Sequence, residues 1–435
     1  MIQQNIMTRI SNAVESLSDE IISLTTSLIQ IPSVNPCLDT VNYEETVGGE
    51  TKVNQFLKPV MEKFGLETDF WEIEKGRANL VGISRGCGDG RSIIFNGHVD
   101  TVATGPKEAW TVAGPFSGAI INGKMYGRGT TDMKGGNVSA IISLKALHLA
   151  GFRPKGDVIL EMVSGEEMMN TEIGTGSAIS RGYRADAAVV MEPTGAPYRL
   201  AIISTTPGAL ILNITVKGKA AHTLNRNEIV RAGGAGEKVA VSAIEKGMII
   251  FNGLLKLEEE WGQTKAHPAF PSPGCFTICP TTFSGGLEGL AFIPDRCNIN
   301  YVIWYSPSDT VSQVKEEITN QIHRYAQTDL WLRENPPELN WHGSGWPPYD
   351  LPVNSPICIS AQSVYQQLFQ KKVGPVGFMG VDDASFLNAA GIPTITLGPG
   401  TTLNAHTINE HIEVQDLIDA AKLYAVLIAE WCGVE

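Results

Sequence analysis

The chain has 435 residues, a mass of 46.9 kDa and a formal net charge of -13. Single hydrophobic cores stop growing at about 250–300 residues, so two domains are expected. The negative charge disfavours nucleic acid and anionic membrane surfaces as partners, because both repel an acidic protein. No stretch approaches the roughly 18 continuous apolar residues of a membrane-spanning helix, and the first twenty residues lack a signal-peptide pattern.

The cysteines point to a reducing compartment. There are seven of them, an odd and scattered set. The pair with the shortest spacing, Cys275 and Cys279, has no matching second pair at zinc-ligand spacing. We therefore expect reduced thiols and a cytoplasmic protein.

The N-terminal part alternates between helical and strand patterns of apolar residues. Buried strands are predicted from short apolar runs, and helices from apolar positions at helical spacing. Such alternation is typical of parallel strands joined by crossover helices. The predicted helices are 10–31, 137–151 and 174–183, and the predicted strands are 79–84, 92–97, 157–163 and 186–191.

The pattern changes after Pro207 and Gly208, where apolar and polar residues alternate as in a strand with one wet face. We expect an inserted α+β domain over 207–325. A mostly parallel mixed sheet flanked by helices then takes 1–206 and 326–435. The inserted domain's predicted strands are 209–223, 276–286 and 296–307, and its helices 236–262 and 309–327; helices 356–370 and 414–431 and strand 394–398 follow it.

Polar residues gather where predicted strands end, which is where open α/β sheets place their sites. Four segments follow a strand, and a fifth leads into a helix. The residues are His98 and Asp100 after 92–97, Glu166 and Glu167 after 157–163, Glu192 after 186–191, His406 after 394–398, and Asp132 before 137–151.

The two imidazoles and four of these carboxylates form a ligand set for divalent metals, chiefly zinc. The set suffices for two ions about 3.5–4 Å apart with one bridging carboxylate. A dication also accounts for the adjacent Glu166 and Glu167, because it neutralises one and leaves the other as a base. Each signal alone has a plainer interpretation: Asp132 as a helix N-cap, and the glutamates as a solvated turn.

Six stretches together resemble the dinuclear-zinc aminoacylase and carboxypeptidase family, which includes acetylornithine deacetylase, succinyl-diaminopimelate desuccinylase and glutamate carboxypeptidase. They are "FNGHVDTV", "MYGRGTTDMKGG", "VSGEEMMN", "VMEPTG", "VKGKAAHT" and "GIPTITLGPGTTLNAHTINEHI". They occur in order over nearly the whole chain. The resemblance implies a zinc-exopeptidase-like catalytic domain and an inserted ferredoxin-like lid that also forms a homodimer.

The resemblance also implies roles for individual residues. His98 and Glu192 would bind one metal, Glu167 and His406 the other, and Asp132 would bridge them. Asp100 would hold the second imidazole nitrogen of His98. Glu166 would be the general base, and His222 in "KAAHT" would reach an active site from the lid, often that of the partner subunit. Zinc is favoured as the metal, with cobalt or manganese as alternatives.

The lid departs from the family at two positions that commonly serve substrate binding. Ala291 and Trp304 align with an asparagine and with an arginine that grips the substrate carboxylate. A neutral aromatic ring does not replace a bidentate guanidinium. Arg296 or Arg226 can take over that role, or Trp304 can offer a flat wall to a substrate without a carboxylate. Trp304 can also be ordinary lid core.

The resemblance implies a metal-dependent amidohydrolase in which a zinc-bridging hydroxide attacks a small N-acylated substrate and Glu166 acts as general base. The substrate can be an N-acyl amino acid, an N-acyl or N-formyl amine, or a short peptide. Two alternatives stay open: a catalytically inactive, metal-stabilised binding protein of the same fold, and a dinuclear-metal phosphoesterase.

Overall fold

The computed structural model of the chain describes residues 3–270, 274–287 and 291–435. Residues 1–2 of the predicted first domain, and 271–273 and 288–290 of the predicted inserted domain, lie outside the described residues. The chain divides into two compact units. The first unit comprises 1–204, 350–377 and 382–435, and the second unit comprises 205–349 and 378–381.

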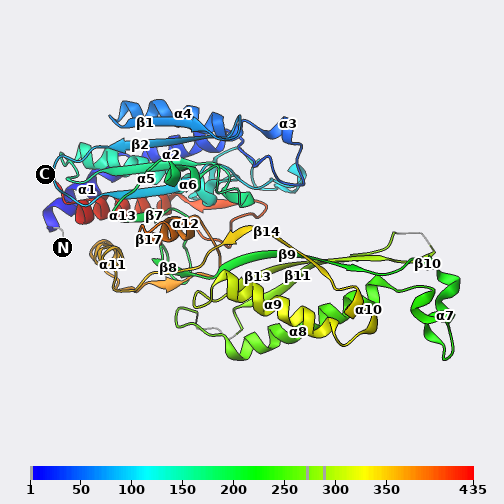
Figure 1. Ribbon diagram of the computed structural model, residues 1–435. Helices are drawn as coiled ribbons and strands as arrows, with labels where there is room; N and C mark the ends of the chain where they lie inside the picture. The colour runs from blue at the N-terminus through cyan, green and yellow to red at the C-terminus, as the bar shows by residue number, and fades with distance from the viewer. Residues whose placement is uncertain (1–2, 271–273, 288–290) are drawn as a thin grey trace. The chain divides into compact units, whose positions relative to one another are not determined.

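A nine-stranded mixed sheet organises the first unit (Figure 1). Its order is β1-β2-β6-β3-β7-β17-β8-β15, with β16 paired to β8. The central strands β6, β3, β7 and β17 run parallel, and β1, β2 and β8 pair antiparallel. The strands are β1 (Glu67–Glu72), β2 (Ala78–Ser84), β3 (Ile93–His98), β6 (Val158–Val163), β7 (Ala188–Val190), β8 (Ile203–Thr206), β15 (Tyr349–Asp350), β16 (Val376–Gly377) and β17 (Thr394–Thr396).

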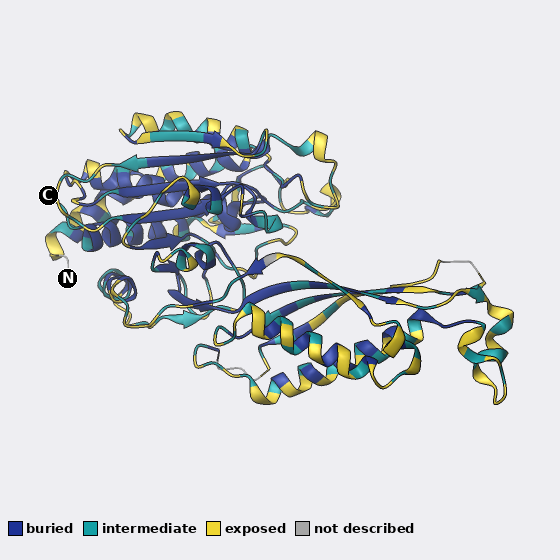
Figure 2. Ribbon diagram, viewed as in Figure 1, coloured by how far each residue is buried: buried dark blue, intermediate teal, exposed yellow. Residues whose placement is uncertain are grey.

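Helices flank this sheet, and its central strands are buried (Figure 2). Helices α5 and α13 pack on each other and against β3. There the rings of Phe95 and Tyr424 pack edge to face, with 5.1 Å between their centroids. Helices α6 and α12 pack against β6 and β7. The helices are α1 (Gln4–Ser16), α2 (Ser18–Ile29), α3 (Tyr43–Thr46), α4 (Gly49–Lys63), α5 (Gly135–Leu149), α6 (Thr175–Ser180), α11 (Pro356–Phe369), α12 (Ala384–Ala389) and α13 (Val414–Cys432).

A small three-stranded sheet ties distant parts of the first unit together. It contains β4 (Ala119–Ile121), β5 (Lys124–Tyr126) and β18 (His411–Glu413), in the order β18-β5-β4. The antiparallel β18-β5 pair places residues 411–413 beside residues 124–126. The segment before β18 and the segment after β5 are therefore held close together, although they are far apart in sequence.

The second unit has its own antiparallel sheet, in the order β11-β13-β9-β14, with α8 packed on it and α9 packed on α8. Its core surrounds the fully buried Trp261, whose Nε1 donates to Glu317 Oε1 at 2.9 Å. The elements are β9 (Gly208–Lys217), β10 (Ala221–His222), β11 (Thr277–Gly285), β12 (Phe292–Ile293), β13 (Arg296–Tyr305), β14 (Glu338–Trp346), α7 (Arg226–Val230), α8 (Ala243–Thr264), α9 (Val311–Ala326) and α10 (Leu330–Glu334).

The predicted fold class is confirmed: an α/β sheet, parallel at its centre, with an inserted α+β unit. Local boundaries differ. The helix expected over 10–31 is two helices that meet at Leu17, and α8 begins at Ala243, where the Ser242 side chain accepts the N–H of Glu245. The second unit extends past residue 325, because β14 pairs with β9. Among the described residues, no helix has the length and apolarity needed to cross a bilayer.

Helix α5 is buried on nearly all sides, and its packing should dominate the stability of the first unit. Ile142→Ala removes a fully buried side chain and should lower the free energy of unfolding by about 2–5 kcal/mol. Leu149→Ala, on the same helix but at a side chain 60% exposed, should change it by less than about 0.5 kcal/mol. Urea denaturation followed by circular dichroism measures both, and equal midpoints would contradict this packing.

Candidate dinuclear metal centre

Four strand ends of the first unit bring the predicted metal ligands together. His98 is the last residue of β3, Glu166 and Glu167 follow β6, and Glu192 follows β7. His406 lies in the loop after β17. Because β6, β3, β7 and β17 are parallel neighbours, their carboxyl ends meet at one edge of the sheet. The ligand cluster at this edge is therefore a direct product of the strand order.

Asp132 lies between the two imidazoles. Its Oδ1 is 3.0 Å from His98 Nε2, and its Oδ2 is 3.1 Å from His406 Nε2. Glu192 Oε1 is 3.1 Å from His98 Nε2, and Glu167 Oε2 is 3.0 Å from His406 Nε2. Each imidazole thus faces its own glutamate and one oxygen of the shared aspartate.

Glu166 stands slightly apart from these four contacts. Its Oε2 is 4.0 Å from His98 Nε2, beyond hydrogen-bond distance. By contrast, the Oε1 of its neighbour Glu167 accepts the backbone N–H of Val102 at 3.1 Å, which fixes that carboxylate. Of the two adjacent glutamates, Glu167 is held against an imidazole, whereas no described residue makes a hydrogen bond to the side chain of Glu166.

Asp100 contacts the second imidazole nitrogen of His98, as expected, but through its main chain. The Nδ1 of His98 lies 2.9 Å from the backbone carbonyl of Asp100, whereas the Asp100 carboxylate is 3.8 Å away and makes no hydrogen bond to it. The carboxylate instead accepts the N–H groups of Gly165 at 2.9 Å and Glu167 at 3.1 Å, and the Asn35 amide at 2.7 Å. Asp100 therefore orients His98 through its main chain and the glutamate pair through its side chain.

Glu410 positions the segment that carries Asp132, and the sequence interpretation missed it. Its carboxylate is fully buried; Oε1 accepts the N–H groups of Gly129 at 2.8 Å and Thr131 at 3.1 Å, and Oε2 accepts from Arg128. A signal was present, since "HTINEH" places an acidic residue four positions after His406. Its partners, about 280 positions earlier in the chain, could not be found from local sequence.

Burial and crowding shift the pKa values of the cluster. Burial raises the pKa of Glu166 well above its ordinary value; it also raises that of Glu192, where the charge of Asp132 adds to it, and that of Glu167. For Asp132, hydrogen bonds from His406 and His98 outweigh the effect of burial and hold its pKa far below the usual range. The cluster therefore contains more carboxylates than its two imidazoles can neutralise.

Two further carboxyl groups, those of Glu161 and Asp383, are buried near the same strand ends. Glu161 in β6 accepts from Asn96 at 2.9 Å, the same amide donates to Thr175, and the Thr175 hydroxyl donates to Asp383 at 2.6 Å. Burial raises the pKa of Glu161 and of Asp383 to about 7. The charge of Asp383 also contributes to the raised pKa of Glu166. A cation bound at this edge of the sheet would therefore be stabilised by several buried carboxyl groups.

The donor set fits divalent cations. One ligand atom each from His98, Asp132 and Glu167 lie within 4.8 Å of one another, and so do atoms from His98, Glu166 and Glu192. Imidazole nitrogen and carboxylate oxygen are ligands that zinc and neighbouring transition metals accept. Dications at this edge would satisfy the excess of buried carboxylate charge. The residues can thus hold metal on chemical grounds.

The remaining predicted residues lie in the second unit. Trp304 and Arg296 are at opposite ends of β13, opposite Ala209 and Lys217 respectively, and eight residues of strand span about 26 Å. The two side chains, which were alternatives for substrate binding, therefore lie far apart on the same strand. The alternative, Arg226, pairs with Glu245 on α8.

His222 also belongs to the second unit. It ends β10 on an exposed edge, opposite Phe292, and its Nδ1 accepts the N–H of Leu224 at 3.1 Å. The ring's other nitrogen, Nε2, is the atom that can bind a substrate or an oxyanion. Ala291 is exposed on the neighbouring segment, and its carbonyl accepts the N–H of Thr223.

Glu410 should matter for metal binding although it contacts no proposed ligand side chain. Glu410→Ala leaves the Arg128 guanidinium and two N–H groups without their acceptor, so metal affinity should fall by about 10–100-fold. Glu413→Ala, which removes an exposed carboxylate three residues away, is the matched control and should bind metal normally. Titration of metal-depleted protein by calorimetry measures both, and equal affinities would contradict the positioning role.

The chain is similar to enzymes of known activity. It is 31% identical to N-formyl-4-amino-5-aminomethyl-2-methylpyrimidine deformylase of Halalkalibacterium halodurans, over 96% of each chain. The Bacillus subtilis enzyme of the same name is 32% identical, over 97% of this chain and 96% of that protein. A probable succinyl-diaminopimelate desuccinylase of Staphylococcus aureus is 26% identical over 86% of this chain and 91% of that protein.

Solved structures share the fold. A tripeptidase from Staphylococcus aureus superposes with a TM-score of 0.72 at 18% identity, covering 95% of this chain and 98% of that one. Human carnosine dipeptidase 1 superposes with a TM-score of 0.70 at 14% identity, covering 98% and 99%. The model of peptidase family M20/M25/M40 matches residues 94–430. The chain therefore belongs to the M20/M25/M40 family of metal-dependent hydrolases.

Proposed function

We propose that this family member is a dizinc amidohydrolase that removes a small acyl group, such as formyl, from an amine. The supporting observation is the Asp132 carboxylate, whose two oxygens each face a different imidazole at 3.0 and 3.1 Å. That is the arrangement of a carboxylate shared by two ions. Formyl as the acyl group is supported by the two deformylases to which the chain is similar over almost its whole length.

Each metal position has its own ligands in this proposal. His98 and Glu192 would hold one ion, His406 and Glu167 would hold the other, and Asp132 would be shared between them. Zinc is the proposed metal, because imidazole and carboxylate ligands in this number suit it, and cobalt or manganese would occupy the same donors. When bound, the ions would supply an acidified water and polarise the substrate's amide carbonyl.

Glu166 performs the proton transfers. Its side chain is not restrained by an imidazole, and burial raises the pKa of its carboxyl group, so its carboxylate accepts a proton more readily than an exposed one does. It takes a proton from the attacking water and passes it to the leaving amine nitrogen. Asp100, through its bonds to Gly165 and Glu167, keeps this segment in place.

The second unit completes the site in this proposal. His222, on an exposed edge, would donate from Nε2 to the oxyanion that develops on the former carbonyl. We also propose that the second unit mediates a homodimer, as the resemblance implies, so that His222 can act on the partner's site. A cytoplasmic location stays a prediction from the sequence.

The base assignment is tested by paired glutamine variants. Glu166→Gln should keep both metals and lose about 10²–10⁴-fold in turnover, because the metal ligands remain and the proton acceptor is gone. Glu167→Gln should instead lose metal, because it removes a ligand. Metal analysis alongside deformylation of an N-formyl amine separates the two, and normal turnover by the Glu166 variant would remove it from the mechanism.

His222→Ala should slow turnover with both metals still bound, because the residue acts on the oxyanion and holds no ion. Mixing this variant with Glu166→Gln should restore part of the activity if the histidine acts across subunits, since a mixed dimer contains one intact site. Turnover of the mixture and metal content of each variant are the measurements. Normal turnover by His222→Ala would leave the residue without a catalytic part.

A further inference from the structure

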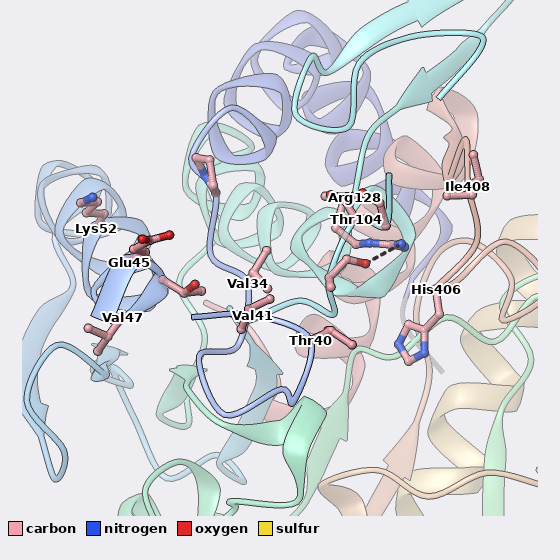
Figure 3. Close-up of a pocket in the computed structure, with 15 residues that line it drawn as sticks. Val34, Thr40, Val41, Glu45, Val47, Lys52, Thr104, Arg128, His406 and Ile408 are labelled. Atoms are coloured by element: carbon pink, nitrogen blue, oxygen red, sulfur yellow. Dashed lines mark hydrogen bonds between the residues drawn. The ribbon is translucent and has the colours of Figure 1, made fainter. Parts of the chain in front are cut away.

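A cavity of about 820 Å³ opens beside His406, within the first unit (Figure 3). Its walls come from the segment before α4, the loop after β3 and the loop that carries His406. Between the two ends of the cavity lie Val34, Thr40 and Val41, with Thr104 and Ile408 nearer the His406 end (Figure 3). The lining nearest His406 thus combines Ile408 with Thr104 and Arg128, and two valines line the middle of the cavity.

The charges around this cavity are arranged unevenly. Arg128 lines it near His406, but its guanidinium is buried and pairs with the fully buried Glu410 and with the carbonyl of Ala103. Glu45 and Lys52 lie toward the opposite end (Figure 3). Among the described lining residues, the cation beside His406 is therefore Arg128, and Glu410 balances its charge.

This arrangement disfavours one substrate group. A carboxylate on the carbon attached to the amide nitrogen, as in an N-acyl amino acid, would lie close to the metal centre and away from Lys52. Burying it against valine and threonine without a paired cation costs free energy. An uncharged ring or branched group would instead gain from contact with Val34, Val41 and Ile408, and the threonine hydroxyls can bond to its polar atoms.

We propose that this cavity binds the larger of the two groups joined by the scissile amide and selects an uncharged group there. The inference rests on the proposed amidohydrolase function and adds the substrate class: N-acyl amines without a carboxylate next to the nitrogen. The specificity-determining residues are Val34, Val41 and Ile408, together with the balanced Arg128–Glu410 pair.

Two probes that differ only in a carboxylate test this preference. N-formylbenzylamine carries an uncharged ring, and N-formylphenylglycine, used as both enantiomers, adds a carboxylate on the carbon attached to nitrogen. Turnover by the metal-loaded enzyme and dissociation constants for metal-loaded Glu166→Gln are measured for both. We expect the uncharged probe to bind and react about tenfold or more better than either enantiomer.

Val41→Arg places a cation in the apolar wall and should reduce this preference by about tenfold or more, by improving the carboxylate probe. Val41→Trp fills the cavity and should weaken binding of the benzyl probe. Val353→Arg and Val353→Trp, at a valine 60% exposed outside the cavity lining, are the matched controls and should leave the preference unchanged.

These measurements distinguish failure of the proposed substrate class from failure of the proposed amidohydrolase function. Equal or better binding of the carboxylate probe, or a preference that Val41 variants do not alter, would overturn the substrate class while deformylation still stands. Hydrolysis of neither probe nor any other N-formyl amine by metal-loaded enzyme would overturn the proposed function. A preference for the uncharged probe that Val41→Arg reduces and Val353→Arg does not would support the cavity's role.

Discussion

The constraint on which the rest of the first unit depends is the close packing of carboxylates at one edge of a parallel sheet. Glu166, Glu167, Glu192 and Asp132 are within reach of two imidazoles, and burial raises the pKa of the three glutamates. Such a cluster is costly unless a cation shares it. The surrounding structure serves to hold these acids together at a fixed spacing, which is what a two-metal hydrolase requires.

That spacing is maintained by groups that do not face the metal positions. The carboxylate of Asp100 joins the His98 segment to the glutamate pair, and the carboxylate of Glu410 joins the C-terminal loop to the Asp132 segment. Both bind backbone N–H groups, so they orient the main chain of the ligand segments directly. A site built in this way is rigid at its base, while His406, 51% exposed, borders the adjacent cavity.

Much of the fold could be predicted because its central strands are continuous apolar runs, and the meeting of the candidate ligands at one sheet edge because four of their five segments directly follow those runs. What failed depends on tertiary contacts. The break at Leu17, the strand β14 beyond residue 325 and the distant partners of Glu410 leave little trace in local periodicity. The contact of Asp100 with the second nitrogen of His98 was expected, but sequence spacing could not show that the main-chain carbonyl makes it and that the carboxylate binds other groups.

The order in which the ligands occur along the chain has a consequence for biosynthesis. His98 and Asp132 leave the ribosome early, but His406, Glu410 and α13, which packs on α5, are translated last, after the whole of the second unit. The candidate ligands His98, Asp132, Glu166, Glu167 and Glu192 precede the second unit, whereas His406 follows it. The full candidate set therefore comes together only when the C-terminal segment folds back onto residues translated before the second unit.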